Sequence, residues 1–314
     1  MKAIFHYDVS PGIEAQLKAA ESDWLSVDSC PEADEERLYS LLEEADVLWH
    51  VLKPATAEVI AKAPKLRLIQ KVGIGVNTID LEAAKARDIA VCNMPGTNSQ
   101  AVAEVTVMLM LAALRRAVAF DAQTRAGRGW ALEPADFDRV GEIAGRTVGL
   151  VGYGAVGRRI APVVKAIGAK VLYTDIAPVP DAEAEWRDLP ALLAEADIVS
   201  LHVPLTDETD RMINAQALGS MKRGAVLINA ARGGLVDEAA LVDALRSGPL
   251  LAAGLDTFAA EPVAADNPLL QLDNVVLMPH VAWLTPETIG RSIGIAVENS
   301  RRLKDSEDFL HRVV

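Results

Sequence analysis

The sequence has few cysteines and far more acidic than basic residues. Its two cysteines, Cys30 and Cys92, are too few for a disulfide scaffold and belong to no paired metal-ligand spacing, so we expect no metal site. Lysine and arginine total 31 against 44 aspartate and glutamate residues, a formal net charge of −13. A dedicated binder of nucleic acid or of anionic membranes needs a basic surface, so the composition argues against both partners.

The sequence also lacks a long apolar segment. Its longest apolar run, Val105 to Leu114, has about half the length that a membrane span requires. Met1-Lys2 leads directly into a strand-like run, so we expect no secretory signal peptide and a cytoplasmic location. Of the 314 residues, 51% are apolar, which is enough to bury a sizeable core, and the length predicts about two domains.

Short β-rich runs alternate with amphipathic helical patterns along nearly the whole chain, which is typical of an α/β fold with parallel sheets. We expect strands at 2–6, 47–52, 66–72, 89–92, 147–151, 170–174, 198–202, 225–229, 251–255 and 275–278. A helix predicted over 99–119 is apolar on most sides and should be buried or lie in a subunit interface. A polar connector follows it over 125–142, and the last helix, over 286–304, has no strand after it.

A glycine-rich turn, Gly152-Tyr153-Gly154-Ala155-Val156-Gly157, directly follows the predicted strand at 147–151 and opens a helix. This glycine spacing is weak evidence on its own. A second predicted strand follows, however, and ends in Asp175, which completes a dinucleotide-binding unit. Gly152 permits the tight turn, Gly154 lets a pyrophosphate approach the backbone, and Gly157 lets the helix pack closely on the strand. Asp175 can accept hydrogen bonds from ribose hydroxyls and would repel a 2′-phosphate, so we expect NAD rather than NADP. A purely structural turn and a methyltransferase remain alternatives on these residues alone.

Three further segments place polar residues at the ends of later strands: Asn229-Ala230-Ala231-Arg232-Gly233-Gly234, Leu255-Asp256-Thr257-Phe258-Ala259-Ala260-Glu261-Pro262, and Met278-Pro279-His280-Val281-Ala282-Trp283. Together with Gly73-Ile74-Gly75, Val102-Ala103-Glu104, Leu201-His202-Val203-Pro204 and the glycine turn, these segments resemble the D-isomer-specific 2-hydroxyacid dehydrogenases. The resemblance covers essentially the whole chain, and its motifs are highly specific when taken jointly.

The resemblance implies that Arg232, Glu261 and His280 are the catalytic residues. Carbonyl reduction needs these types, because a guanidinium can hold a 2-oxo acid and an imidazole can donate a proton. Glu261 would hold the ring of His280 through its other nitrogen. The methyltransferase alternative fails because it gives these three residues no task. Each also has a plainer interpretation, and the assignment of Glu261 depends most on the resemblance.

The remaining contacts are implied by the resemblance with less support. Expected cofactor contacts are Thr106, Tyr153, Gly154, Ala155, Val156, Asp175, His202, Val203, Pro204, Thr209, Ala230, Ala231, Arg232, Asp256 and His280. Expected substrate contacts are Lys53, Gly73, Ile74, Gly75, Arg232, His280 and Trp283. A solvated lysine and a packing tryptophan explain Lys53 and Trp283 equally well, and Thr106 and Thr209 could simply bond to backbone.

The family's plan implies a Rossmann NAD-binding domain, 99–284, inserted into a flavodoxin-like substrate domain, 1–98 and 285–314, and a homodimer formed through the helix near 99–119 and the Rossmann domain. The implied reaction is the NAD-dependent reduction of a small 2-oxo acid to the D-2-hydroxy acid. The sequence looks most similar to hydroxypyruvate or glyoxylate reductases and glycerate dehydrogenases. A D-3-phosphoglycerate dehydrogenase and a non-catalytic NAD-sensing scaffold, like the C-terminal-binding corepressors, are the alternatives. A formate dehydrogenase is disfavoured because that family lacks the glutamate.

Overall fold

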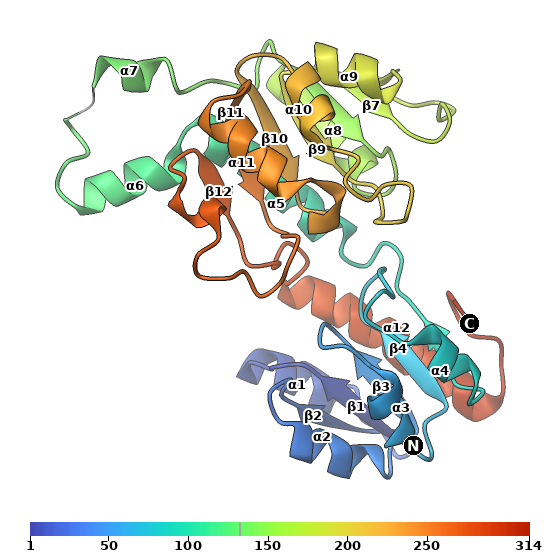
Figure 1. Cartoon of the computed structure of the whole chain (residues 1–314). Helices are drawn as coiled ribbons and strands as arrows, with labels where there is room; N and C mark the ends of the chain where they lie inside the picture. Colours follow the sequence, from blue (N-terminus) through green and yellow to red (C-terminus); the bar gives the residue numbers. More distant parts are fainter. Residues whose placement is uncertain (132) are drawn as a thin grey trace. The chain divides into compact units, whose positions relative to one another are not determined.

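The chain divides into two compact units. A computed structural model describes residues 1–131 and 133–314. Unit 1 comprises Met1–Asn98 and Leu284–Val314, and unit 2 comprises Ser99–Trp283, so unit 1 contains both ends of the chain (Figure 1).

Unit 1 contains a parallel sheet with the strand order β2-β1-β3-β4-β5. Its strands are β1 (Lys2–His6), β2 (Ser26–Cys30), β3 (Val47–His50), β4 (Leu68–Lys71) and β5 (Ala90–Cys92). Its helices are α1 (Pro11–Ala19), α2 (Glu35–Leu42), α3 (Ala57–Ala61), α4 (Leu81–Lys85) and α12 (Pro286–Asp305). This strand order is the flavodoxin-like one, in which ligands bind at the carboxyl ends of the strands.

The last helix, α12, packs against α1 and β4 and so completes unit 1. Two buried polar contacts fix it there. The indole N–H of Trp49 donates to Ser300 Oγ over 3.4 Å, and Asn299 Nδ2 donates to Gln70 Oε1 over 2.6 Å. Because buried polar groups are costly when unpaired, these contacts determine where α12 sits on the sheet.

Unit 2 contains a second parallel sheet, with the order β12-β11-β10-β9-β6-β7-β8. Its strands are β6 (Thr147–Val151), β7 (Lys170–Thr174), β8 (Glu185–Trp186), β9 (Ile198–Leu201), β10 (Ala225–Asn229), β11 (Leu250–Leu255) and β12 (Val275–Leu277). Its helices are α5 (Ser99–Leu114), α6 (Ala117–Arg125), α7 (Pro134–Phe137), α8 (Gly157–Ile167), α9 (Leu189–Glu195), α10 (Ala215–Ser220) and α11 (Glu238–Arg246). The order reverses beside β6, as in dinucleotide-binding folds, and the predicted α/β class with parallel sheets is confirmed.

The helix predicted over 99–119 is wrong beyond Leu114, where α5 ends. Arg116 takes a left-handed conformation, with a φ of +48°, and its buried guanidinium pairs with Asp136 and Asp273. These pairs hold the chain in a break before α6 begins, so tertiary contacts override a continuous helical pattern. The expected connector over 125–142 also contains the short helix α7.

Candidate active site

The glycine turn lies between β6 and α8, against the end of β9. Gly152 has a φ of +99°, and a Cβ there would lie 2.7 Å from the carbonyl oxygen of His202. A Cβ on Gly157 would lie 2.5 Å from the carbonyl oxygen of Gly152, whereas one on Gly154 would meet nothing within 4 Å. Within the described chain, the amides of residues 154–156 donate no hydrogen bond. The turn therefore offers open space lined with N–H donors, which fits a pyrophosphate.

Asp175 follows β7 and lies beside this turn. Its carboxylate accepts hydrogen bonds of 2.8 Å from the amides of Tyr153 and Ile176. These bonds leave lone pairs on both carboxylate oxygens, as hydrogen bonding to ribose hydroxyls would require. The side chain of Ile176, which the sequence reasoning did not single out, is fully exposed next to this carboxylate.

The three residues expected to be catalytic all lie in unit 2. His280 Nδ1 is 2.6 Å from Glu261 Oε2, and the amide of Phe258 donates to Glu261 Oε1 over 2.9 Å. Burial pushes the pKa of Glu261 upward, but the hydrogen bonds from His280 and Phe258 outweigh it and hold this pKa below its ordinary value. Glu261 is therefore ionised at neutral pH, and its position leaves Nε2 as the nitrogen of His280 that can exchange a proton with a ligand.

The backbone of His280 is held by Asp256, at the end of β11. His280 has a φ of +57°, and its amide donates to the carbonyl oxygen of Asp256 over 2.8 Å. The buried carboxylate of Asp256 accepts from the next two amides, those of Val281 and Ala282, each over 2.9 Å. Burial raises the pKa of Asp256, against these two hydrogen bonds. Trp283 closes the loop, since its indole N–H donates to the carbonyl oxygen of His280 over 3.1 Å.

Arg232 lies in the loop after β10. Burial lowers the pKa of its guanidinium, and the negative charge of Glu261 opposes that shift. Asn229, whose role the sequence reasoning missed, fixes this loop, because its side chain donates to the carbonyl oxygen of Arg232 and accepts from the amide of Ala231. Its place at the end of a strand, where asparagine commonly forms local turns, was the available signal.

Gly233 joins the loop of Arg232 to the loop of Glu261. A Cβ on Gly233 would lie 1.9 Å from the carbonyl carbon and oxygen of Phe258, the residue whose amide binds Glu261. Only a glycine allows this approach, so the two loops are packed backbone against backbone.

His202 and the remaining expected cofactor contacts occupy the carboxyl ends of β9 and β10 or the helix α5. Ser200 Oγ lies 2.9 Å from His202 Nε2, and burial lowers the pKa of His202 to about 3, so its ring is neutral at physiological pH. Thr106 is fully buried and its hydroxyl donates to the carbonyl oxygen of Val102. Thr209 Oγ1 donates to the carbonyl oxygen of Pro204. Val203, Pro204, Ala230 and Ala231 follow these two strands. Cofactor contact remains a prediction for all of these residues.

The remaining expected substrate contacts lie in unit 1. Lys53 follows β3, and its ammonium donates to the carbonyl oxygen of Glu32 over 2.7 Å and to Glu35 Oε1 over 2.8 Å. The loop containing Gly73, Ile74 and Gly75 follows β4, and the side chain of Ile74 is exposed. These two loops are neighbours, because Ala55 and Ile79 form a β-bridge.

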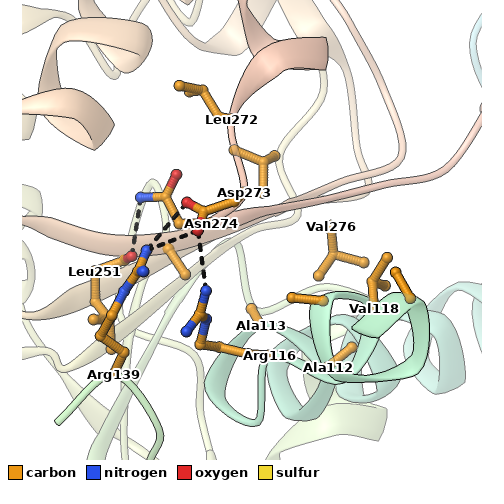
Figure 2. Close-up of a pocket in the computed structure, with 14 residues that line it drawn as sticks. Ala112, Ala113, Arg116, Val118, Arg139, Leu251, Leu272, Asp273, Asn274 and Val276 are labelled. Carbon is orange, nitrogen blue, oxygen red and sulfur yellow. Dashed lines mark hydrogen bonds and ion pairs between the residues drawn. The ribbon is translucent and has the colours of Figure 1, made fainter. Parts of the chain in front are cut away.

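A distinct cavity of about 180 Å³ lies elsewhere in unit 2. Figure 2 shows Arg116 and Arg139 directed at Asp273 on one side of it and Ala112, Val118 and other small apolar side chains on the other. None of its lining residues is an expected site residue. Within residues 1–131 and 133–314, no group of three or more His, Cys, Asp and Glu could hold a metal ion. No helix of this part of the chain is both long and apolar enough to cross a membrane.

Comparisons with known proteins relate the chain to one family. The family model described as the D-isomer specific 2-hydroxyacid dehydrogenase NAD binding domain matches residues 107–282. The chain is 41% identical over 272 residues to a glyoxylate reductase of Aeropyrum pernix, covering 84% of this chain and 81% of that protein. It is also 41% identical over 299 residues to a D-3-phosphoglycerate dehydrogenase of Mycobacterium leprae, covering 93% of this chain but only 55% of that longer protein. A crystal structure of a Thermus thermophilus protein, 36% identical, aligns over 100% of both chains with a TM-score of 0.89.

Proposed function

The chain belongs to the D-isomer-specific 2-hydroxyacid dehydrogenase family, and from this premise we propose that it reduces a small 2-oxo acid to the D-2-hydroxy acid with NADH. The observation that carries the proposal is the 2.6 Å contact between His280 Nδ1 and Glu261 Oε2, on a loop packed against that of Arg232. This arrangement provides a proton donor and a cation for a carboxylate or a polarised carbonyl, which are the groups that a 2-oxo acid presents.

NAD fits the glycine turn and Asp175, and the bound nicotinamide supplies or accepts the hydride. Residues of the chain itself transfer the proton and stabilise the charge that develops on the substrate. Protonated His280 donates its Nε2 proton to the carbonyl oxygen, and the neutral ring keeps its Nδ1 proton toward Glu261. Arg232 holds the substrate and stabilises the negative charge that develops on the oxygen. In the reverse direction His280 Nε2 accepts the hydroxyl proton.

We infer that the substrate has a short, uncharged tail, as glyoxylate and hydroxypyruvate do. The ammonium of Lys53 supports this choice, because Glu32 and Glu35 already engage it and reduce its availability for a phosphate. D-3-Phosphoglycerate dehydrogenase activity is the second candidate, favoured by the 41% identity to the Mycobacterium leprae protein. That relative is nearly twice as long as the aligned region, so its whole activity does not transfer directly.

We further propose that unit 2 binds the cofactor, that unit 1 binds the substrate carboxylate, and that the protein is a homodimer. The dimer proposal is supported by apolar side chains exposed on and after α5. They include Met108, Leu111, Val118, Trp130 and Phe137, and the side chain of Trp130 is 89% exposed. Light scattering on the purified protein tests the dimer, and a monomer at micromolar concentration would contradict it.

The activity is tested by loss of nicotinamide absorbance with NADH and a panel of glyoxylate, hydroxypyruvate, phosphohydroxypyruvate and pyruvate. We expect turnover to be highest with the uncharged-tail acids. His280→Ala should lower kcat at least ~10²-fold, because the methyl group of alanine cannot donate a proton. Wild-type protein that binds NADH but turns over no acid would support the scaffold alternative. A clear preference for phosphohydroxypyruvate would support the second candidate.

A further inference from the structure

Two consecutive backbone amides in unit 1, those of Ile74 and Gly75, have no acceptor within the described chain. They belong to the loop after β4, where the side chain of Ile74 is 46% exposed, so a ligand can approach them. Gly73, which precedes them, has a φ of +143°. Successive N–H groups that point the same way form an anion-binding concavity. The direction in which these two amides point therefore decides whether the loop can bind a carboxylate.

The peptide groups that contain these amides are both held by their carbonyl oxygens. The amide of Met94 donates to the carbonyl oxygen of Gly73 over 2.8 Å. The side-chain amide of Asn93 donates to the carbonyl oxygen of Ile74 over 3.0 Å. In a trans peptide the C=O of one residue and the N–H of the next point in opposite directions. The hydrogen bond from Asn93 to the carbonyl of Ile74 therefore makes the N–H of Gly75 point away from Asn93. In the same way, the hydrogen bond from Met94 to the carbonyl of Gly73 makes the N–H of Ile74 point away from Met94.

Asn93 is well placed to fix the loop because its own backbone is anchored. It follows β5, its amide donates to the carbonyl oxygen of His311 over 3.1 Å, and its carbonyl oxygen accepts from Gln70 Nε2. Gln70 in turn is bonded to Asn299 of α12. The donor that orients Gly75 is thus attached to the sheet and to the last helix.

We propose that Asn93 is a positioning residue for substrate binding: by holding the carbonyl of Ile74 it directs the N–H of Gly75 at the carboxylate of the 2-oxo acid. This inference rests on the proposed function. Met94 contributes through its backbone and so acts whatever its side chain, whereas the contribution of Asn93 depends on its side-chain amide. Asn93 is therefore the position at which substitution can misdirect the loop.

The test compares Asn93→Ala and Asn93→Asp with Asn77→Ala, a control in the same loop whose exposed side chain makes no hydrogen bond to the described residues. In Asn93→Ala the N–H of Gly75 is no longer aligned with the substrate carboxylate, so one hydrogen bond to a charged group is lost. KM for glyoxylate should therefore rise about tenfold. Asn93→Asp should raise it further, because its carboxylate repels both the carbonyl of Ile74 and the substrate. For both variants we expect kcat, the Kd for NADH and the Tm to remain near those of the wild type.

The outcomes separate this inference from the function on which it rests. A wild-type protein that neither reduces nor binds any 2-oxo acid overturns both. An active wild type together with an unchanged KM in both Asn93 variants overturns the inference alone. A lower Tm and a weaker NADH affinity that accompany the raised KM would indicate a merely structural role and would also overturn it. Should Asn93→Ala fold poorly, the isosteric Asn93→Asp decides the question.

Discussion

Replacing Glu261 by glutamine removes one negative charge beside His280 and leaves the size of the side chain almost unchanged. Glu261 Oε2 lies 2.6 Å from His280 Nδ1, a distance typical of a short charge-assisted hydrogen bond. Glu261 Oε1 accepts from the amide of Phe258, a bond that the oxygen of glutamine can keep. When the glutamine oxygen keeps the bond to Phe258, its NH2 group faces His280 Nδ1. Two hydrogen-bond donors then face each other, which disfavours the protonated form of the His280 ring.

The size of the effect follows from the loss of this one bond. A hydrogen bond to a charged group contributes ~1.5–3 kcal/mol. The side chains of His280 and Glu261 are 23% and 34% exposed, so solvent screening favours the lower end of that range. At ~1.4 kcal/mol per factor of ten in rate, we expect kcat/KM for reduction in Glu261→Gln to fall about tenfold. The loss falls on reduction, because that direction uses the protonated ring, which glutamine stabilises less.

The assay is kcat/KM at one neutral pH, measured in both directions. Reduction should fall about tenfold, whereas oxidation, which uses the neutral ring, should fall less. Glu238→Gln is the matched control, because Glu238 also accepts a loop amide, that of Ala259, without touching His280. An unchanged kcat/KM for reduction in Glu261→Gln, or an equal fall in Glu238→Gln, would refute the reasoning.

Three further changes have definite expected outcomes. Asp175→Ala should lower the preference for NADH over NADPH at least ~10-fold, since like-charge repulsion of a 2′-phosphate is lost; initial rates with both cofactors measure it. Gly233→Ala forces a Cβ against Phe258, so it should lower the free energy of unfolding by ~1–3 kcal/mol and reduce kcat. Gly219→Ala is the control and should do neither, because its Cβ would meet nothing within 4 Å. Burial lowers the pKa of His202 to about 3 in the folded chain, against 6.5 in the unfolded chain, so the unfolded chain binds a proton first. Stability should therefore fall by up to ~1.4 kcal/mol per pH unit as the pH drops from 6.5 toward 3, and Tm against pH should show a shallower slope for His202→Asn.

The sequence predicted ten of the twelve strands that the described residues form and missed two edge strands. The expected strands at 2–6, 147–151, 170–174 and 225–229 have the observed bounds of β1, β6, β7 and β10. The runs Ser26–Cys30 and Glu185–Trp186 were not predicted, and they form the edge strands β2 and β8. Most residues of these two strands are at least partly exposed, so the continuous apolar run that reveals a buried parallel strand is absent from them, whereas the edge strands β5 and β12 are mostly buried and were predicted.

The placement of the three residues proposed to be catalytic could be predicted because each lies in the loop after a strand. Arg232, Glu261 and His280 come after β10, β11 and β12, and parallel strands bring their carboxyl ends to one edge of the sheet. The contact between Glu261 and His280 needed only that rule and the resemblance. The break at Arg116 could not be predicted, because its partner Asp273 is 157 residues away in the sequence.

The contacts that hold the loop backbones of the candidate site are of a different kind. Asp256 bonds to an amide 26 residues away and Asn93 to a carbonyl 19 residues away, and each acts on backbone atoms rather than on a side chain. A backbone amide is the same in every residue, so the sequence around the recipient carries no sign of the donor or acceptor that holds it. His280 illustrates this dependence, because its left-handed backbone conformation is unfavourable without the hydrogen bonds that Asp256 accepts from this loop. Side-chain chemistry at strand ends is therefore readable from a motif, whereas the direction of an imidazole or of a loop amide requires the three-dimensional structure.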